Sequence, residues 1–460
     1  MTQHTLEDLL QRAGSPVQML RDSQTGPYAF PVVRPEFTNW RDEQRAWRTT
    51  CALMDQSHHM TDLYVEGPDA LRLLSDLAVN SFRTFAVNQA KQFVACNHDG
   101  YVIGDAILFF LDENRLSLVG RPPAANWVQF NAQTGAYDVQ VERDERSAQN
   151  DGRRKVFRFE LQGPRAIDVM QKILGTMPPD VRFFHMDTFR IGGVDVRALR
   201  HGMVGEPGWE LFGPWEQGDR VRAAIAEAGQ EFGLRLVGAR AYPTTCLESG
   251  WIPSPLPAIY TGDRMRPYRQ WLTDRSYEAM ASLGGSYAAS RIEDYYLTPY
   301  DLGYGKMVKF DHEFIGRAAL EAMAARTHRQ KVTLVWNSAD VQRAFGSIFE
   351  EPGKGPKYLD VPLANYATLP YDQVTSNGRL IGLSTYTGFS SNERSMLSLA
   401  MLDAAHAAPG TEVTVVWGEE GGGTSKPTVE RHVQTGIRAT VQPAPISEVA
   451  RVAYRPKALA

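Results

Sequence analysis

The stretch VEGPDAL, residues 65–71, reappears in form as LQGPRAI, residues 161–167. In both copies a β-type apolar segment ends at Gly-Pro, and apolar residues at helical spacing follow. Glycine can turn the chain, and proline can open a helix because its fixed φ and missing N–H cost nothing there. The pair therefore predicts two strand–Gly-Pro–helix units that form a duplicated, pseudo-symmetric α+β core. The alternative is a chance match, because Gly-Pro is common in turns.

The chain has 460 residues, too many for one hydrophobic core. From about Lys331 the runs KVTLVW, GRLIGLSTYTG, TEVTVVWG and GIRATVQ are short, β-type and separated by turn residues, which predicts a β-barrel or jelly-roll domain. We expect three domains, two α+β domains at residues 1–155 and 156–328 and a β-rich domain at 329–460. The segment GEEGGGTSK, residues 418–426, lacks lysine after its second glycine, and Pro427 blocks a following helix, so it predicts a hairpin loop rather than a phosphate-binding loop.

Composition excludes several classes of function. Charged residues make up 22% of the chain, and the net charge is -4. The sequence has no run of lysine and arginine of the kind that binds a phosphate backbone, so we expect no nucleic-acid partner. The apolar run of residues 106–111 is far shorter than the about 20 residues of a membrane span, and the chain's start lacks the pattern of a secretory signal. Cys51, Cys96 and Cys246 are odd in number and widely spaced. We expect reduced thiols and a cytoplasmic protein.

Two adjacent histidines stand in MDQSHHM, residues 54–60. Neighbouring side chains on an extended segment point to opposite faces, so His58 and His59 are not expected to bind one ion together. No other metal-ligand spacing accompanies them, and we expect no metal site. His58 is expected to brace its loop.

Several motifs together resemble the glycine-cleavage T-protein family, the folate-dependent aminomethyltransferases. DQSHHM with VEGPDA is similar to that family's D-x-S-H-M…GPDA start, and FIGR, residues 314–317, is similar to another of its elements. The most specific match is RHGMVGEPGWEL, residues 200–211, to the signature R-T-G-Y-T-G-E-x-G-[FW]-E-[LI]. GRPPAANW (120–127), RAYP (240–243), ESGWIPSPLPAIYTGD (248–263) and IEDYY (292–296) are similar to the tetrahydrofolate-dependent O-demethylases of lignin-derived aromatic acids. The resemblance covers nearly the whole chain.

The resemblance implies a three-domain ring around a central folate pocket, in which a methyl group passes from an aryl methoxy group to N5 of tetrahydrofolate. The implied partners are folate and a small aromatic acid. The vanillate-type enzymes have tyrosine at the position of Phe30, so phenylalanine there favours syringate, with vanillate or 3-O-methylgallate as alternatives. The family's paired aspartates match here only as Gly104-Asp105, so its acid/base scheme does not transfer unaltered, and a catalytic role for Asp105 stays open.

The resemblance also implies roles at the substrate. Tyr242 is expected to be the general acid, because a tyrosine with a pKa of about 10 matches a departing phenol. The Arg121 guanidinium, held before two prolines, would bind the aromatic carboxylate. Gln56 and His59 would hydrogen-bond the phenolic oxygen, with His59 expected to titrate near a pKa of about 6.5. Tyr28 and Phe30 would pack against the ring. A structural tyrosine and a surface arginine are the alternatives for Tyr242 and Arg121.

On the cofactor side, Glu210 would accept paired N–H donors from the pterin's aminopyrimidine edge. Gln162 and Trp251 match folate-contacting positions, although core packing is an equal alternative for Trp251.

Two other functions stay open. A true aminomethyltransferase would need a lipoyl-protein partner. A non-enzymatic folate-binding protein of the iron–sulfur maintenance type has a cysteine in K-G-C-[FY]-x-G-Q-E, where this chain has Met203. Demethylation by an oxygenase is not favoured, because the motifs expected of iron or flavin sites are missing. Nothing in the sequence specifies an oligomeric state.

Overall fold

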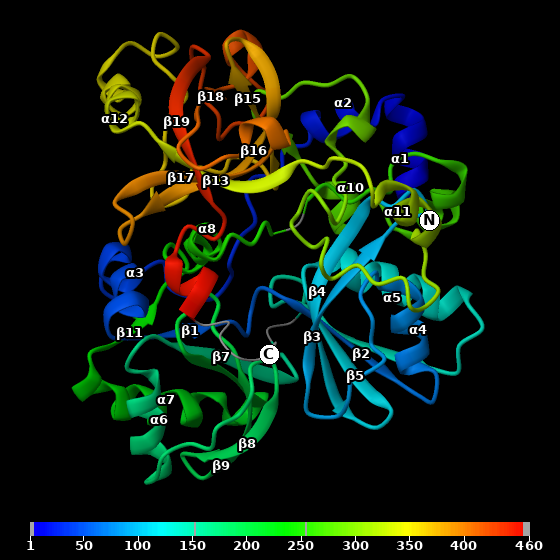
Figure 1. Ribbon diagram of the computed structural model, residues 1–460, viewed down its shortest axis with the longest axis vertical. Helices are drawn as coiled ribbons and strands as arrows, with labels where there is room; N and C mark the ends of the chain where they lie inside the picture. The colour runs from blue at the N-terminus through cyan, green and yellow to red at the C-terminus, as the bar shows by residue number, and fades with distance from the viewer. Residues whose placement is uncertain (1–3, 151–152, 254, 454–460) are drawn as a thin grey trace.

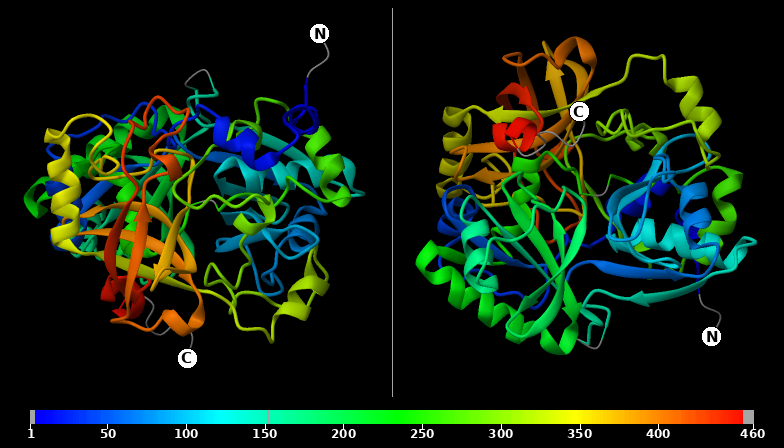
Figure 2. Two further views of the ribbon diagram at one scale, coloured as in Figure 1. Left: turned by 90° about the horizontal axis from the view of Figure 1, so that it is seen from above. Right: turned by 60° about the horizontal axis from the view of Figure 1, so that its bottom comes forward.

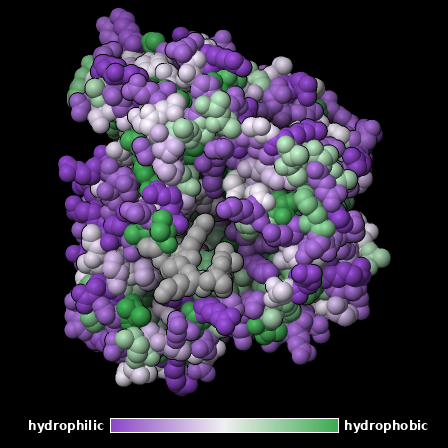
Figure 3. Space-filling model, in the orientation of Figure 1, coloured by the Kyte–Doolittle hydropathy of each residue, from purple (hydrophilic) through white to green (hydrophobic). Residues whose placement is uncertain are grey.

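The computed structural model describes residues 4–150, 153–253 and 255–453. Figure 1 shows three lobes around the middle of the molecule, one on a five-stranded sheet, one on a six-stranded sheet and one on a closed barrel. This is the three-lobed α+β ring expected from the sequence. The face seen in Figure 3 is mostly hydrophilic. Among the described residues no helix has the length and apolar character needed to cross a bilayer.

Antiparallel pairing builds the whole first sheet, in the order β3-β4-β5-β2-β6. The strands are β2 (Thr61–Glu66), β3 (Ala90–Cys96), β4 (Val102–Asp112), β5 (Arg115–Gly120) and β6 (Gln140–Asp144). Helices α4 (Ala70–Leu77) and α5 (Pro122–Thr134) pack on it (Figure 1). The apolar run of residues 106–111 lies in β4, which is buried and paired on both sides.

The second sheet contains a strand from the first third of the chain. Its order is β11-β1-β7-β10-β9-β8, with β1 parallel to β11 and antiparallel to β7. The strands are β1 (Cys51–Asp55), β7 (Val156–Gln162), β8 (Met186–Ile191), β9 (Val194–Arg200), β10 (Gly208–Pro214) and β11 (Leu234–Val237). Helices α6 (Ala166–Leu174) and α7 (Gly218–Gly229) share a core with one face (Figures 1 and 2). The other face packs against the first sheet through residues such as Phe109 and Phe212.

The predicted duplication is confirmed. After β2 and β7 the chain turns at Gly67 and Gly163, whose φ values are 141° and 131°. A Cβ at Gly67 would lie 2.3 Å from a backbone oxygen, and one at Gly163 2.6 Å, so both turns need glycine. The prolines, however, do not open the helices. They lie in the turn, and α4 and α6 begin two residues later, at Ala70 and Ala166.

The C-terminal lobe is a closed barrel, as predicted, in the order β13-β17-β16-β15-β18-β19. Its strands are β13 (Gln330–Trp336), β15 (Asp372–Ser376), β16 (Arg379–Ser390), β17 (Ser395–Leu402), β18 (Glu412–Trp417) and β19 (Thr435–Pro443). Helix α12 (Ser338–Gly346) lies on its outside (Figure 2). The segment 418–426 is the first part of the long loop, residues 418–434, that connects the antiparallel strands β18 and β19, and it contains a 3-10 turn at Glu420–Gly422.

The remaining segments join the lobes. They contain α1 (Leu6–Ala13), α2 (Pro16–Asp22), α3 (Trp40–Thr49), α8 (Thr245–Ser249), α9 (Arg266–Trp271), α10 (Tyr277–Met280), α11 (Arg317–Met323), and the paired short strands β12 (Leu283–Gly284) and β14 (Leu369–Pro370). The described part of 251–262 forms no helix or strand, as its prolines predict; Ser254 lies outside the described residues. Cys51, Cys96 and Cys246 are free and buried, as expected.

The hydrophobic cores qualify the expected domain bounds. Apolar side chains between Ile252 and Leu320 belong to the core of the first sheet, whereas Cys51 and Leu53 of β1 belong to that of the second. The chain therefore crosses between lobes more often than three consecutive domains would. The division at residues 155 and 328 stays a prediction.

Candidate active site

Alternation along β7 and β10 places polar side chains on the face of the second sheet that meets the first. Along β7, Phe157, Phe159 and Leu161 pack in the core with α6 and α7. The intervening side chains point the other way, as does Glu210 of β10, which lies between Trp209 and Leu211 of that core. The side chains so placed are Arg158, Glu160, Gln162 and Glu210, and all are buried.

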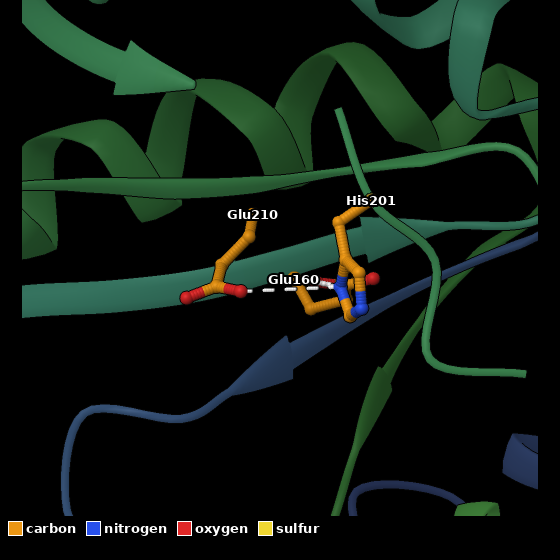
Figure 4. Close-up of side chains that lie close together, drawn as sticks. All are labelled: Glu160, His201 and Glu210. Atoms are coloured by element: carbon orange, nitrogen blue, oxygen red, sulfur yellow. Dashed lines mark hydrogen bonds and ion pairs between the residues drawn. The ribbon is translucent and has the colours of Figure 1, made fainter. Parts of the chain in front are cut away.

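A network of charges joins Arg158, Glu160 and Glu210 with His201, which follows β9; Figure 4 shows Glu160, His201 and Glu210. Glu160 and Glu210 are directly opposite each other on antiparallel strands, with His201 Nδ1 3.5 Å from Glu160 Oε2 and 3.9 Å from Glu210 Oε2. Arg158 forms an ion pair with Glu210, and a second one of 2.9 Å with Asp62 of the first sheet. Burial raises the pKa of Glu160. Burial opposes protonation of His201, but Glu160 and Glu210 outweigh it and raise the pKa of His201.

The ligand atoms of Glu160, His201 and Glu210 lie within 4.8 Å of one another, a spacing that a metal ion could use. Arg158 already binds Glu210, however, and the backbone N–H of Met203 donates to Glu160 Oε1 at 3.3 Å. A metal would have to compete with a cation held in the same site. The contacts describe an ion-pair network, and the expectation of no metal site stays a prediction.

Gln162 offers an unused donor beside this network. Its Oε1 accepts from the backbone N–H of Val204 at 3.2 Å, which anchors the loop between β9 and β10. Its Nε2 is buried and has no hydrogen-bond partner among the described residues. An unsatisfied buried donor is costly, and a ligand acceptor would remove that cost.

Trp251 is placed on the other side, with the first sheet. Its indole N–H donates to Asp105 Oδ2 at 2.9 Å, and the Tyr304 hydroxyl donates to the same oxygen at 2.7 Å. Burial raises the pKa of Asp105, although both donors act to lower it. The indole N–H is thus already used, and only the ring of Trp251 is available to a ligand. Within the described ranges, no hydrogen bond joins Trp251 to Glu210 or Gln162.

Four rings from three distant segments pack together in an aromatic cluster, which we term the aromatic pocket. Tyr28 and Phe30 lie in the irregular segment between α2 and α3, His59 in the turn after β1, and Tyr242 before α8. The ring centroids are 5.7 Å apart for Tyr28–Phe30, 5.4 Å for Phe30–Tyr242, 4.8 Å for Phe30–His59 and 4.9 Å for His59–Tyr242. These four residues, which resemblance alone had brought together, therefore lie in one place.

Arg121 closes the Tyr28 end of this pocket. It follows β5 and precedes Pro122 and Pro123, which are buried at the start of α5 and fix its backbone. Its guanidinium lies over the Tyr28 ring, 4.2 Å from the centroid. In the part of the chain that the structure describes, no carboxylate forms an ion pair with it, and, besides burial, the groups that act on its pKa are tyrosines and Cys246. A guanidinium without a counter-ion at a pocket's end is suited to an anionic ligand.

Gln56 connects the aromatic pocket with the charged network. Its Nε2 donates to Met203 Sδ at 2.9 Å, and its Oε1 is buried without a hydrogen-bond partner among the described residues. The Tyr28 hydroxyl donates to the His59 carbonyl, which joins the segment of residues 23–39 to this turn.

His58 and His59 separate as predicted, although in a turn rather than an extended segment. His58 Nδ1 is 2.8 Å from Ser147 Oγ, and its ring packs on Trp215, so it braces the loop. His59 faces the aromatic pocket, where burial and, to a smaller extent, Arg121 lower its pKa to about 3. The ordinary pKa expected from the sequence is therefore wrong for His59, and the ring is neutral at physiological pH.

Burial also changes Tyr242. It raises the pKa of the hydroxyl well above 10, with further contributions from Cys246, Glu160 and Glu210 and an opposing one from Gln56. Tyr242 therefore stays protonated in the free protein and is coupled electrostatically to the charged network. Tyr242 thus packs on Phe30 and His59 and is near enough to both glutamates for them to raise the pKa of its hydroxyl.

Comparison with known proteins identifies the family. A family model described as the GCVT N-terminal domain matches residues 16–254, more than half of the chain. The chain belongs to the GCVT family. Its relatives include the syringate O-demethylase of Sphingobium sp., 51% identical over 98% of this chain and 97% of that protein. The sesamin methylene transferase of Sinomonas sp. is 34% identical over 85% and 88%, and the aminomethyltransferase of Caldanaerobacter subterraneus 28% over 85% and 86%.

A solved GCVT-family structure has the same fold. The crystal structure of the glycine cleavage system aminomethyltransferase T from Bartonella henselae aligns with a TM-score of 0.57 at 20% identity, over 96% of this chain and 97% of that one. The Glu160–His201 pair departs from the family signature, which has threonine at the position of His201. Sequence reasoning missed this pair, although the alternation of Arg158, Glu160 and Gln162 with apolar residues along β7 was a signal.

Proposed function

We propose that this GCVT-family protein is a tetrahydrofolate-dependent aryl O-demethylase. The observation that carries the proposal is the aromatic pocket with Arg121, which has no carboxylate partner among the described residues, at one end and Tyr242 at the other. Glu210 is near enough to Tyr242 to add to the rise that burial causes in the pKa of its hydroxyl. The 51% identity with a syringate O-demethylase along nearly the whole chain supports it. The chemistry is that of a methyltransferase with folate as the acceptor.

The residues around Glu210 fit a reduced pterin. The aminopyrimidine edge presents neighbouring N–H donors and an acceptor, and the protein offers the Glu210 carboxylate together with the unused donor Gln162 Nε2. The ring of Trp251 is available for stacking from the first sheet. When bound, tetrahydrofolate supplies the nucleophile N5. Glu210, Gln162 and Trp251 are the residues proposed to hold it.

The aromatic pocket fits a methoxybenzoate. Arg121 would bind the carboxylate, and Tyr28 and Phe30 would pack on the ring. Gln56 Oε1, which has no hydrogen-bond partner among the described residues, would accept the hydrogen of a phenolic hydroxyl. His59 is neutral, so it can donate or accept a hydrogen bond but cannot supply a positive charge. Together these contacts would direct a methoxy group next to Tyr242.

The proposed transfer breaks the methyl C–O bond and forms a C–N bond to N5, with the electron pair of the C–O bond leaving on oxygen. Tyr242 donates a hydrogen bond, and then its proton, to that oxygen. N5 loses its own proton, which restores Tyr242, so the products are 5-methyltetrahydrofolate and the free phenol. No oxidant is needed. Positioning of the two reactants and stabilisation of the departing oxygen are the protein's contributions.

The raised pKa of Tyr242 sets a condition on this step. The match with an ordinary phenol, expected from the sequence, does not apply to the free protein, because burial makes Tyr242 a weaker acid. The departing oxygen would be buried in the same apolar pocket, which raises the pKa of its phenol too. Proton transfer is then again between groups of similar basicity.

Syringate is the proposed substrate, with vanillate and 3-O-methylgallate as alternatives. Support comes from the relative and from Phe30, whose ring leaves an apolar wall beside His59 and Tyr242. The test is anaerobic incubation of the purified protein with tetrahydrofolate and each acid, followed by chromatographic detection of 5-methyltetrahydrofolate and the demethylated product. Formation of neither product with any of the three acids would overturn the proposal.

A further inference from the structure

The Tyr277 hydroxyl is an unsatisfied polar group near the Arg121 end of the aromatic pocket. Tyr277, the first residue of the short helix α10, has its hydroxyl buried without a hydrogen-bond partner among the described residues. Its ring is 6.4 Å from that of Tyr28, which carries the Arg121 guanidinium on its face. The guanidinium is close enough to act on Tyr277, where it partly opposes the rise in pKa that burial causes.

The neighbouring carboxylate is turned away from this site. Glu278 is fully buried, and its two oxygens accept from Asn126 Nδ2 at 3.0 and 2.9 Å. The Tyr268 hydroxyl donates to Glu278 Oε1 at 3.3 Å. The carboxylate that follows Tyr277 in sequence is therefore satisfied elsewhere and does not neutralise Arg121.

The position of Tyr277 is fixed before any ligand binds. The Ser276 side chain caps α10 by accepting from the Ala279 N–H at 3.2 Å. The Tyr260 hydroxyl donates to the Glu278 carbonyl at 2.9 Å, which ties the helix to the core of the first sheet. The backbone thus holds the unsatisfied Tyr277 hydroxyl beside the Arg121 guanidinium, which has no carboxylate partner in the described residues. A carboxylate can accept hydrogen bonds from both groups and neutralise the guanidinium.

We propose that Tyr277 and Arg121 together form the receptor for the substrate's carboxylate, with the Tyr277 hydroxyl donating to one oxygen and the Arg121 guanidinium to both. This inference rests on the proposed function for the identity of the acid, but it concerns binding and not the transfer. Tyr277 is then a specificity-determining residue that distinguishes an aromatic acid from the same ring without a carboxylate. The hydroxyl adds a hydrogen bond to a charged group, a kind stronger than a neutral pair.

Calorimetric titration without folate tests the receptor independently of turnover. Wild type, Tyr277→Phe and Arg121→Lys are titrated with syringate and with 2,6-dimethoxyphenol, in which hydrogen replaces the carboxylate. We expect Tyr277→Phe to weaken syringate binding about tenfold or more and to leave binding of the neutral phenol within about twofold. Arg121→Lys keeps the charge but loses the paired donors, and should show the same selectivity. Tyr358→Phe, at a partly exposed tyrosine of the barrel lobe, is the matched control.

The outcomes separate the two proposals. Unchanged syringate binding in Tyr277→Phe would overturn the role of Tyr277, as would an equal loss for both ligands, which indicates a structural defect. Failure of wild type to bind syringate, vanillate and 3-O-methylgallate would overturn the receptor itself. Suppose that the wild type binds the acid but transfers no methyl group, and that Tyr277→Phe loses syringate binding selectively. This result would support the receptor and overturn only the proposed reaction.

Discussion

The two sides of the site differ in how their polar groups are satisfied. On the side of the second sheet the charged groups are paired, Arg158 with Glu210 and Asp62 and His201 with Glu160, and among the described residues Gln162 Nε2 is a polar atom left without a hydrogen-bond partner. On the side of the aromatic pocket, Arg121 has no carboxylate partner in the described ranges, and Gln56 Oε1 and the Tyr277 hydroxyl have no hydrogen-bond partners there. Paired charges fix geometry before a ligand arrives, whereas unpaired ones bear a desolvation cost that a ligand can relieve. Substitutions on the first side should therefore affect stability, and those on the second binding and turnover.

Arg158→Met should give the largest effect, on stability. The guanidinium is buried between Phe109 and Phe212, at 4.9 and 4.8 Å from their ring centroids, and it neutralises Glu210 and Asp62. Its removal leaves the buried Glu210 without a guanidinium partner and leaves Asp62 with Arg154 alone, at 2.6 Å. We therefore expect a loss of about 3–5 kcal/mol in the free energy of unfolding. Urea denaturation measures it. The exposed ion pair of Arg165 with Asp168 supplies the control, Arg165→Met, with an expected loss of at most about 1 kcal/mol. Equal losses in the two variants would contradict the comparison.

Tyr242→Phe should give the next largest effect, now on turnover. Loss of the proton donor to the departing oxygen should lower kcat by a factor of about 100 or more, which corresponds to about 2.7 kcal/mol. The ring stays in the pocket, so binding of the acid should change little. Single-turnover formation of 5-methyltetrahydrofolate measures the chemical step, and calorimetry the binding. A kcat within a factor of about three of wild type would remove Tyr242 from the mechanism.

The sequence predicted what local rules decide. The turns at Gly67 and Gly163 could be predicted because the need for glycine is local. The barrel could be predicted because its strands are short and separated by turn residues. Insertion of β1 between β7 and β11 was not predicted, since pairing between strands about 100 or more residues apart leaves no local signal.

Site residues followed the same rule. The family motif located Glu210, Arg121 and Tyr242, but the pKa values of His59 and Tyr242 depend on burial, which is a property of the tertiary structure. Tyr277 was missed because nothing in its own sequence shows that its hydroxyl lacks a partner. Whether a buried hydroxyl has a hydrogen-bond partner depends on the side chains around it. Around Tyr277 these include Tyr28 and Arg121, which are distant in the sequence.

His59→Ala tests the aryl side with a smaller effect. We expect kcat/KM for the aromatic acid to fall about five- to tenfold, the value of one hydrogen bond, with the folate dissociation constant unchanged. The pKa of His59 is near 3 in the folded protein and about 6.5 when unfolded, so between these values the unfolded state binds more protons. Stability contributed by neutral His59 is therefore lost as pH falls from about 6.5 towards 3, by at most about 1.4 kcal/mol per pH unit.

The same variant should show a shallower decline in unfolding free energy over that pH range, measured by urea denaturation at several pH values. In wild type, the pH profile of kcat/KM should show no ionisation of His59 above pH 5. An ionisation near pH 6.5 that disappears in His59→Ala would show that the ring is charged during the reaction. A defect in folate binding alone would place His59 with the other ligand.

Tyr386→Phe should give the smallest effect, and it tests whether the barrel positions the aryl side. Tyr386 lies at an irregularity of the pairing between β16 and β17, with a φ of 34° that is strained for a tyrosine. Its hydroxyl donates to the Pro243 carbonyl at 2.8 Å, directly beside Tyr242. Without it, we expect kcat to fall about threefold while KM for the acid stays unchanged, because the Tyr242 backbone is less well held but the substrate contacts remain. Steady-state kinetics separates the two parameters. A rise in KM with constant kcat would instead place Tyr386 among the groups that bind the substrate. The barrel would then contribute to substrate binding and not only to the positioning of Tyr242.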